Sequence, residues 1–155
     1  MRVRQAMTNR VARIREEVSV LDAAETVALS GVSDLMVVDA SGCFAGVLSE
    51  GDILRAALPD IDEIVAAGGS LDGAFERFVA KGRDLSALPI APLVIRDPIV
   101  LDPDEHVARA AVVLVERAIR VLPVVRDGVL IGTISRADVC SAVAGGLGML
   151  APNVD

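Results

Sequence analysis

Two pairs of polar side chains have the residue types and the spacing that binding chemistry needs. Each pair is a serine followed three positions later by an aspartate: Ser49 with Asp52, and Ser135 with Asp138. A carboxylate accepts two hydroxyl donors at once, and each charge-assisted hydrogen bond contributes about 1.5–3 kcal/mol. At a helix start these side chains would lie beside free backbone N–H groups, which attract a phosphate. The same spacing also fits a helix capping box, which needs no ligand.

Both pairs belong to an internal repeat, which predicts the elements that must position them. Each copy has the pattern of a short strand, a helix, a β-hairpin and a second helix. The order β-α-β-β-α predicts an α/β (α+β) fold built from two such units. The aligned segments are residues 20–24 with 107–111, residues 35–38 with 122–125, and residues 46–53 with 132–139.

The repeat divides the chain into three parts. We expect a first repeat over residues 1–58, a helical insertion or linker over residues 59–89, and a second repeat over residues 90–150. Within the insertion, Ser70 is a plausible N-cap and Gly82 a plausible C-terminal stop of the second of two helices.

The second repeat has the clearest element signals. Residues 98–101 form a short apolar run that predicts a strand, and Asp127-Gly128 predicts a tight hairpin turn. The helix expected over residues 107–119 is apolar on nearly all sides, so one sheet cannot cover it. We therefore expect a homodimer through these helices.

Composition excludes several classes of function. The 155 residues carry a net charge of −7 and only 2% aromatic side chains, which disfavours binding to DNA or RNA. No apolar stretch approaches the ~20 residues that span a membrane, and no secretory signal is recognisable, so we expect a cytoplasmic protein. Cys43 and Cys140 lack the spacing of a metal site and are expected to be buried free thiols.

The sequence offers no catalytic pattern. It lacks a glycine-rich phosphate loop, a Ser/His/Asp set and metal-ligand spacing, so we expect no enzyme activity and no required cofactor. The single histidine, His106, is expected at the start of a helix.

The repeat and its serine–aspartate pairs resemble the cystathionine β-synthase (CBS) domain pair, also called a Bateman module, over residues 3–57 and 90–145. The resemblance depends on three features, and the last of them occurs twice. They are Val3-Arg4-Gln5-Ala6-Met7-Thr8 at the start, Leu122-Pro123-Val124-Val125 before the turn, and Gly-x-x-Ser-x-x-Asp at Gly46, Ser49 and Asp52 and at Gly132, Ser135 and Asp138.

The resemblance implies two repeats packed about a pseudo-twofold axis, with clefts that bind AMP, ADP, ATP or S-adenosylmethionine. It places Ser49 or Ser135 beside the sugar or phosphate, and Asp52 or Asp138 on the ribose hydroxyls. The expected ligand-binding residues are Gly46, Ser49, Asp52, Val100, Arg120, Gly132, Ser135 and Asp138.

The two clefts implied by the resemblance are not equivalent. Arg120 occupies the position from which a basic residue of the opposite repeat meets the phosphate, and its counterpart is Ser33, followed by Asp34. A carboxylate repels a phosphate, so we expect the cleft of Ser49, Asp52 and Arg120 to bind nucleotides better. Met36, where the second repeat has a proline, is a further departure in the first repeat.

The sequence therefore predicts a regulatory module that binds an adenosine-containing ligand and acts on a separate protein or on its own assembly. The alternative is a ligand-free module for protein–protein interaction or dimerisation. A ligand-dependent gain in stability would distinguish the first from the second.

Overall fold

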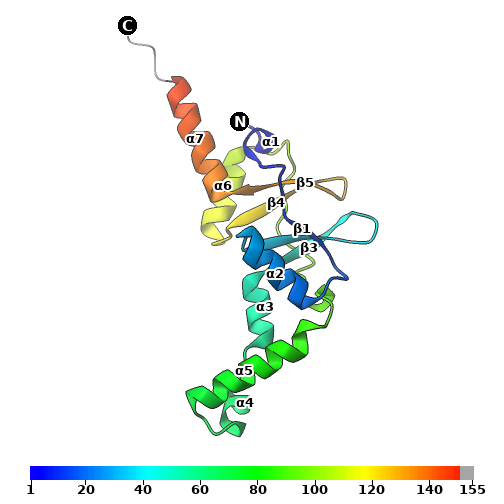
Figure 1. Ribbon diagram of the computed structural model, residues 1–155. Helices are drawn as coiled ribbons and strands as arrows, with labels where there is room; N and C mark the ends of the chain where they lie inside the picture. Colours follow the sequence, from blue (N-terminus) through cyan, green and yellow to red (C-terminus); the bar gives the residue numbers. More distant parts are fainter. Residues whose placement is uncertain (151–155) are drawn as a thin grey trace. The chain divides into compact units, whose positions relative to one another are not determined.

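The computed structural model describes the backbone of residues 1–150 and the side chains of residues 1–145. Helices and small sheets alternate along the chain (Figure 1), as the α/β prediction required. In chain order the elements are α1 (Val3–Ala6), β1 (Arg13–Arg15), α2 (Val20–Ser30), β2 (Asp34–Val38), β3 (Phe44–Ser49), α3 (Glu50–Ala57), α4 (Ile61–Ala66), α5 (Leu71–Ser86), the 3-10 helix η1 (Ala91–Leu93), α6 (Val107–Glu116), β4 (Val121–Arg126), β5 (Val129–Ser135) and α7 (Arg136–Leu150).

The first repeat has the predicted order β1-α2-β2-β3-α3, and its three strands form one sheet with β2 in the middle. Strand β1 runs parallel to β2, with Ile14 opposite Val37. A parallel pair needs a crossover between its strands, and α2 provides it.

The second repeat differs from its prediction at the first strand. Strands β4 and β5 pair in antiparallel fashion, but residues 98–101 contribute only one parallel bridge, from Leu101 to Val124. Pro98 has no N–H to donate to a sheet, which limits pairing at that end of the run. The predicted turn is confirmed, because Asp127 and Gly128 both adopt positive φ angles, 50° and 77°.

The chain forms two compact units that do not coincide with the sequence repeats. Among the described residues, unit 1 comprises residues 1–11, 42–44 and 98–150, and unit 2 comprises residues 12–41 and 45–97. The first residues of the chain therefore pack with the second repeat, and residues 90–97 pack with the first.

Two matching backbone bridges fix these segments. In unit 1 the backbone of Thr8 exchanges two hydrogen bonds of 2.9 Å with that of Thr133 on β5. In unit 2 the backbone of Ile95 exchanges bonds of 2.9 and 3.1 Å with that of Val47 on β3. Each sheet is thus extended by the first segment of the opposite repeat.

Each unit has its own apolar core. In unit 1, Val3 of α1 is fully buried among Leu101 and residues of α6, β4 and β5. In unit 2, Ile90 is fully buried with Leu35 and Leu48 of the sheet. Residues 1–11 and 90–97 each pack with the opposite repeat and are called the exchanged segments below. They contribute to the cores as well as to the backbone pairing.

Two helices occupy the segment between the repeats, α4 and α5. Ser70 caps α5, accepting a hydrogen bond of 3.0 Å from the backbone of Gly73, as predicted. The expected stop at Gly82 is wrong, because α5 continues to Ser86. Glycine ends a helix by adopting a positive φ angle, and Gly82 does not adopt one.

Both cysteines are free, but the prediction that they are buried is wrong. Cys43 lies in the turn between β2 and β3, and Cys140 is exposed on α7. His106 is the N-cap of α6, and its Nδ1 accepts a hydrogen bond of 3.2 Å from the backbone N–H of Ala108. This confirms the prediction that His106 lies at the start of a helix. Among the described residues, no helix combines the length and the hydropathy that crossing a membrane needs.

Candidate functional site

The first serine–aspartate pair forms a capping box where β3 ends and α3 begins. The backbone N–H and the hydroxyl of Ser49 both donate to Asp52 Oδ2, each at 2.8 Å. The backbone N–H of Asp52 donates to Ser49 Oγ at 3.1 Å. The two side chains therefore hold each other in place and satisfy backbone groups at the helix start.

The second pair repeats this geometry where β5 ends and α7 begins. The backbone N–H and the hydroxyl of Ser135 donate to Asp138 Oδ2, each at 2.7 Å, and Asp138 N–H donates back to Ser135 Oγ at 3.2 Å. The capping alternative is therefore confirmed in both repeats. A capped carboxylate also accepts further donors, so the ligand role of the four residues stays a prediction.

Asp52 differs from Asp138 in its electrostatic surroundings. Arg55, one turn further along α3, places its Nη2 2.5 Å from Asp52 Oδ1. Partial burial raises the pKa of Asp52, but the hydrogen bonds from Ser49 and the guanidinium of Arg55 outweigh it, so the pKa is lowered. Ser141 stands at the position corresponding to Arg55 in the second repeat.

The two signature glycines lie against backbone from the exchanged segments. A Cβ at Gly46 would lie 2.6 Å from Val94 Cγ1 and closer still to the carbonyl oxygen of Ile95. A Cβ at Gly132 would lie 2.7 Å from the carbonyl oxygen of Thr8. Packing therefore requires glycine at both positions, and a direct part in ligand binding stays a prediction.

The remaining predicted residues are solvent-accessible. Arg120 is exposed just before β4 in unit 1, whereas Ser49 and Asp52 belong to unit 2. Val100, also in unit 1, is 39% exposed. That these residues share one cleft stays a prediction.

The counterpart of Arg120 has the chemistry that the sequence indicated. The hydroxyl of Ser33 donates to Asp34 Oδ2 at 2.9 Å, so a carboxylate lies beside it. The first repeat has this carboxylate where the second has the guanidinium of Arg120, and the expected difference in nucleotide affinity stays a prediction.

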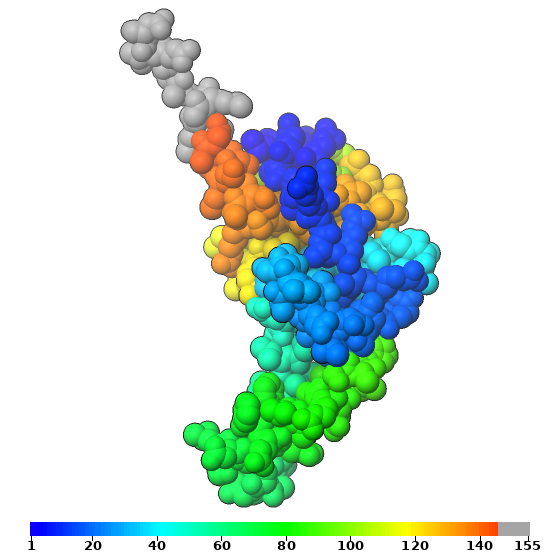
Figure 2. All heavy atoms as spheres, viewed as in Figure 1, coloured from blue at the N-terminus to red at the C-terminus, as the bar shows by residue number. Residues whose placement is uncertain are grey.

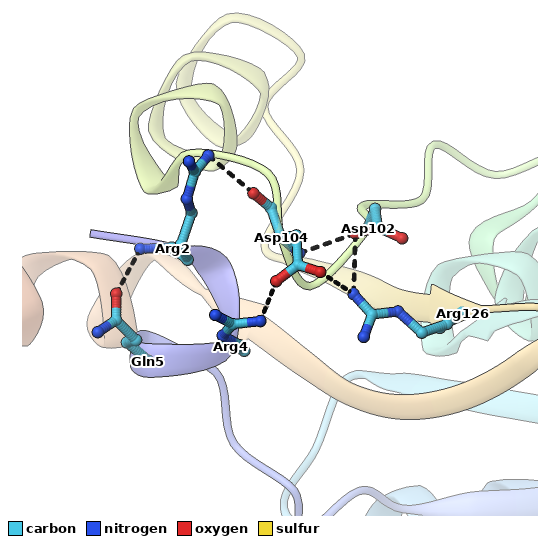
Figure 3. A network of polar contacts seen from close by, with 6 residues as sticks. All are labelled: Arg2, Arg4, Gln5, Asp102, Asp104 and Arg126. Atoms are coloured by element: carbon cyan, nitrogen blue, oxygen red, sulfur yellow. Dashed lines mark hydrogen bonds and ion pairs between the residues drawn. The ribbon is translucent and has the colours of Figure 1, made fainter.

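A charged network that the sequence analysis missed holds the first residues of the chain (Figure 3). Asp104 binds the guanidinium groups of Arg4 and Arg126, and its backbone oxygen accepts a hydrogen bond of 2.9 Å from Arg2. Asp102 accepts from Asp104 N–H at 2.8 Å and from Arg126 at 3.3 Å. The backbone hydrogen bond from Asp104, followed by Arg126, lowers the pKa of Asp102.

This network positions α1 and has no open cation site. Nothing in the local sequence pairs Asp104 with Arg2 and Arg4, about a hundred positions before it, or with Arg126, 22 positions after it. Among the described residues no group of His, Cys, Asp and Glu side chains could hold a metal ion.

Comparison with solved structures identifies proteins of the same fold. The crystal structure of CBSX2, a CBS-pair protein from Arabidopsis thaliana, is 27% identical, with 97% of this chain and 98% of that chain covered and a TM-score of 0.75. A crystal structure of CBSX2 in complex with AMP is also 27% identical, with 94% of this chain and 98% of that chain covered and a TM-score of 0.69.

Comparison with curated proteins finds longer relatives. The A-adding tRNA nucleotidyltransferase of Aquifex aeolicus is 27% identical over 143 residues, which are 92% of this chain and 14% of that protein. Protein MJ1225 of Methanocaldococcus jannaschii is 27% identical over 136 residues, which are 88% of this chain and 40% of that protein. The chain therefore spans less than half the length of either relative.

The family model of the CBS domain matches residues 3–59 and 90–145. These segments contain the aligned residues of the internal repeat and together make up most of the chain. The chain therefore belongs to the CBS domain family and contains two tandem CBS repeats.

Proposed function

We propose that this chain is a regulatory module, not an enzyme, that binds an adenosine-containing ligand such as AMP, ADP, ATP or S-adenosylmethionine between its CBS repeats. The observation that carries the proposal is the serine–aspartate pair that recurs at the start of α3 and of α7 with the same hydrogen bonds. The AMP complex of CBSX2, a structure of the same fold, supports the choice of ligand class.

The chemistry of the pair suits a ribose phosphate. The carboxylate of Asp52 has lone pairs that can accept ribose hydroxyls, and its lowered pKa keeps it ionised at neutral pH. At the start of α3 the N–H groups of Glu50 and Asp52 already donate to Ser33 O at 3.0 Å and to Ser49 Oγ at 3.1 Å, so a phosphate there would be attracted by the helix dipole and by the N–H of Gly51. Arg120 would add a guanidinium fork for the same phosphate.

Calorimetric thermal melts test this proposal, because the chain has no Trp or Tyr for fluorescence. A ligand at 100 times its Kd adds about 2.7 kcal/mol of stability. For a chain of this size that corresponds to a rise in Tm of about 5–10 °C. We expect this rise with at least one of AMP, ADP, ATP and S-adenosylmethionine.

Three variants assign the site. Arg120→Ala should abolish the ligand-induced rise, and Arg117→Ala, an exposed arginine nearby, is the matched control that should keep it. Asp52→Ala and Asp138→Ala remove equivalent caps, so each is compared with its own ligand-free Tm. We expect the larger loss of the rise in Asp52→Ala. A wild-type Tm that no ligand changes would refute the proposal.

A second candidate function is a ligand-free interaction module, and the surface of α6 favours it. Val115 is 71% exposed and Val112 is 52% exposed. Ala110 and Leu114, on the opposite face of the same helix, are buried. We propose that the exposed face mediates homodimerisation. At micromolar concentration Val115→Glu should then halve the mass found by light scattering. A wild-type chain that is already monomeric there, or a mass that the substitution leaves unchanged, would exclude α6 from the interface.

A further inference from the structure

The helix α5 has an apolar surface that the fold leaves uncovered. Its inner residues, among them Phe78 and Leu85, are partly buried, and α5 packs against α3 and α4. Beside this covered face, Leu71, Phe75 and Val79 are 90%, 63% and 40% exposed. Spacing of four residues places these three side chains along one side of the helix.

In Figure 2 no other segment covers the drawn face of residues 61–86, in green, which include α4 and α5. A contiguous exposed apolar surface of this kind marks an interaction site. The name apolar stripe is used below for Leu71, Phe75 and Val79.

Three charged residues border the apolar stripe on one side. Asp72 and Glu76 lie near the start of α5 and Arg83 lies near its end, at spacings of four and seven residues that keep them on one face. Within the part of the chain that the structure describes, none of these three side chains forms a hydrogen bond or an ion pair.

The other basic side chains of α5 are already engaged. Lys81 Nζ lies 2.9 Å from Glu63 Oε2 and 3.2 Å from the backbone oxygen of Leu58, and Arg77 Nη2 lies 3.5 Å from Glu63 Oε1. These contacts hold α4 and the end of α3 against α5. The charges beside the apolar stripe are therefore the ones left for an external partner.

The order of these charges favours a second copy of the chain. In an antiparallel pair related by a twofold axis across the helices, the same border of both helices meets with its order reversed. Arg83 then lies opposite Asp72 of the partner copy, and Phe75 of each copy packs beside Val79 of the other. We propose that two copies associate through antiparallel pairing of α5.

The apolar stripe and the valines of α6 are different residues on different helices, and the proposed pairing of α5 needs no nucleotide. A single helix pair forms a small interface, so we expect weak, concentration-dependent association rather than a permanent dimer. Replacing Arg83 by an acidic residue would place it opposite Asp72 of the partner copy at two symmetric positions in each dimer. We expect this repulsion to raise the Kd of association about tenfold.

Sedimentation velocity on the full chain tests the pairing over about 1 µM to 1 mM, the range of weak protein association. The chain carries Val115→Glu throughout, so that the α6 face does not contribute. We expect the chain with an intact stripe to dimerise and Phe75→Glu to remain monomeric. Phe75 is largely exposed, so its replacement does not disturb the core, and far-ultraviolet circular dichroism checks that the helices remain.

A charge exchange tests the antiparallel arrangement. Arg83→Asp should weaken association about tenfold, and adding Asp72→Arg should restore most of it because the opposed pair is rebuilt with its signs reversed. Asp84→Arg, an exposed change away from the stripe, is the control that should leave the Kd unchanged.

Three results would overturn the proposal. A monomer with an intact stripe at every concentration would exclude a second copy and leave a different protein as the occupant. A Phe75→Glu chain that associates as tightly as its parent would exclude the stripe. A double charge variant as weak as Arg83→Asp alone would exclude the antiparallel register.

Discussion

Replacing Gly46 by alanine should be among the most damaging single changes in unit 2. The new Cβ would lie 2.6 Å from Val94 Cγ1 and closer to the Ile95 carbonyl oxygen, which is itself paired with Val47. Gly46 also has a φ angle of +150°, which residues with a side chain rarely adopt. The substitution therefore adds a clash and backbone strain at the same position.

Each contribution has a usual size. Inserting a methyl group into a filled space costs about 1–3 kcal/mol, and a backbone conformation unfavourable for alanine costs about 1–3 kcal/mol. We expect Gly46→Ala to lower the free energy of unfolding by about 4 kcal/mol, a large part of the roughly 5–15 kcal/mol of a typical domain.

Three other glycines separate the two causes. Gly132 has the close contact without a positive φ angle, Gly42 has a φ angle of +86° with open space around it, and Gly82 has neither. We expect losses of about 1–3 kcal/mol for Gly132→Ala and about 1–2 kcal/mol for Gly42→Ala. Gly82→Ala, within α5, should gain up to about 1 kcal/mol.

Urea unfolding followed by far-ultraviolet circular dichroism measures all four variants. The reasoning is refuted if Gly46→Ala is no less stable than Gly42→Ala, because the contact with residues 94 and 95 would then contribute nothing. A loss in Gly82→Ala would show that open space around a helical glycine does not permit a Cβ.

Two further predictions concern the caps and the core. Because the pKa of Asp52 is lowered in the folded state, its contribution to stability is present above the unfolded pKa of about 3.9 and is lost as the pH falls through the folded pKa. The stability difference between wild type and Asp52→Asn should therefore shrink below about pH 4, and a urea midpoint difference that stays constant in acid would contradict this. Val3→Ala should lower the free energy of unfolding by about 2 kcal/mol because Val3 is fully buried. Val115→Ala, at a largely exposed position, should change it by no more than about 0.5 kcal/mol in the same assay. Equal losses in the two variants would contradict the placement of α1 in the core of unit 1.

Features that depend on neighbouring residues could be predicted from the sequence. The caps at Ser49, Ser135 and Ser70, and the turn at Asp127-Gly128, each involve side chains or dihedral angles within a few positions. The internal repeat then predicted the order of helices and strands, because the same weak pattern occurs in both copies.

Features that depend on distant residues could not be predicted. The bridge between Thr8 and Thr133 and the ion pair between Arg4 and Asp104 join opposite ends of the chain. Gly82 resembles a helix stop because glycine often ends helices, but Leu85, beyond it, packs against the core of unit 2 and the helix continues to Ser86. In such cases tertiary packing outweighs local propensity.

The exchange of first segments between the repeats has a consequence for the order in which the chain folds. Unit 2 needs nothing beyond residue 97, so it can close while later residues are still being synthesised. Unit 1 must wait, because Arg2 and its acceptor Asp104 are 102 positions apart and Thr8 pairs with Thr133. Contacts of such long range form slowly, since the loop between them must close first. We therefore expect the first residues to leave the ribosome to be among the last to be fixed in place.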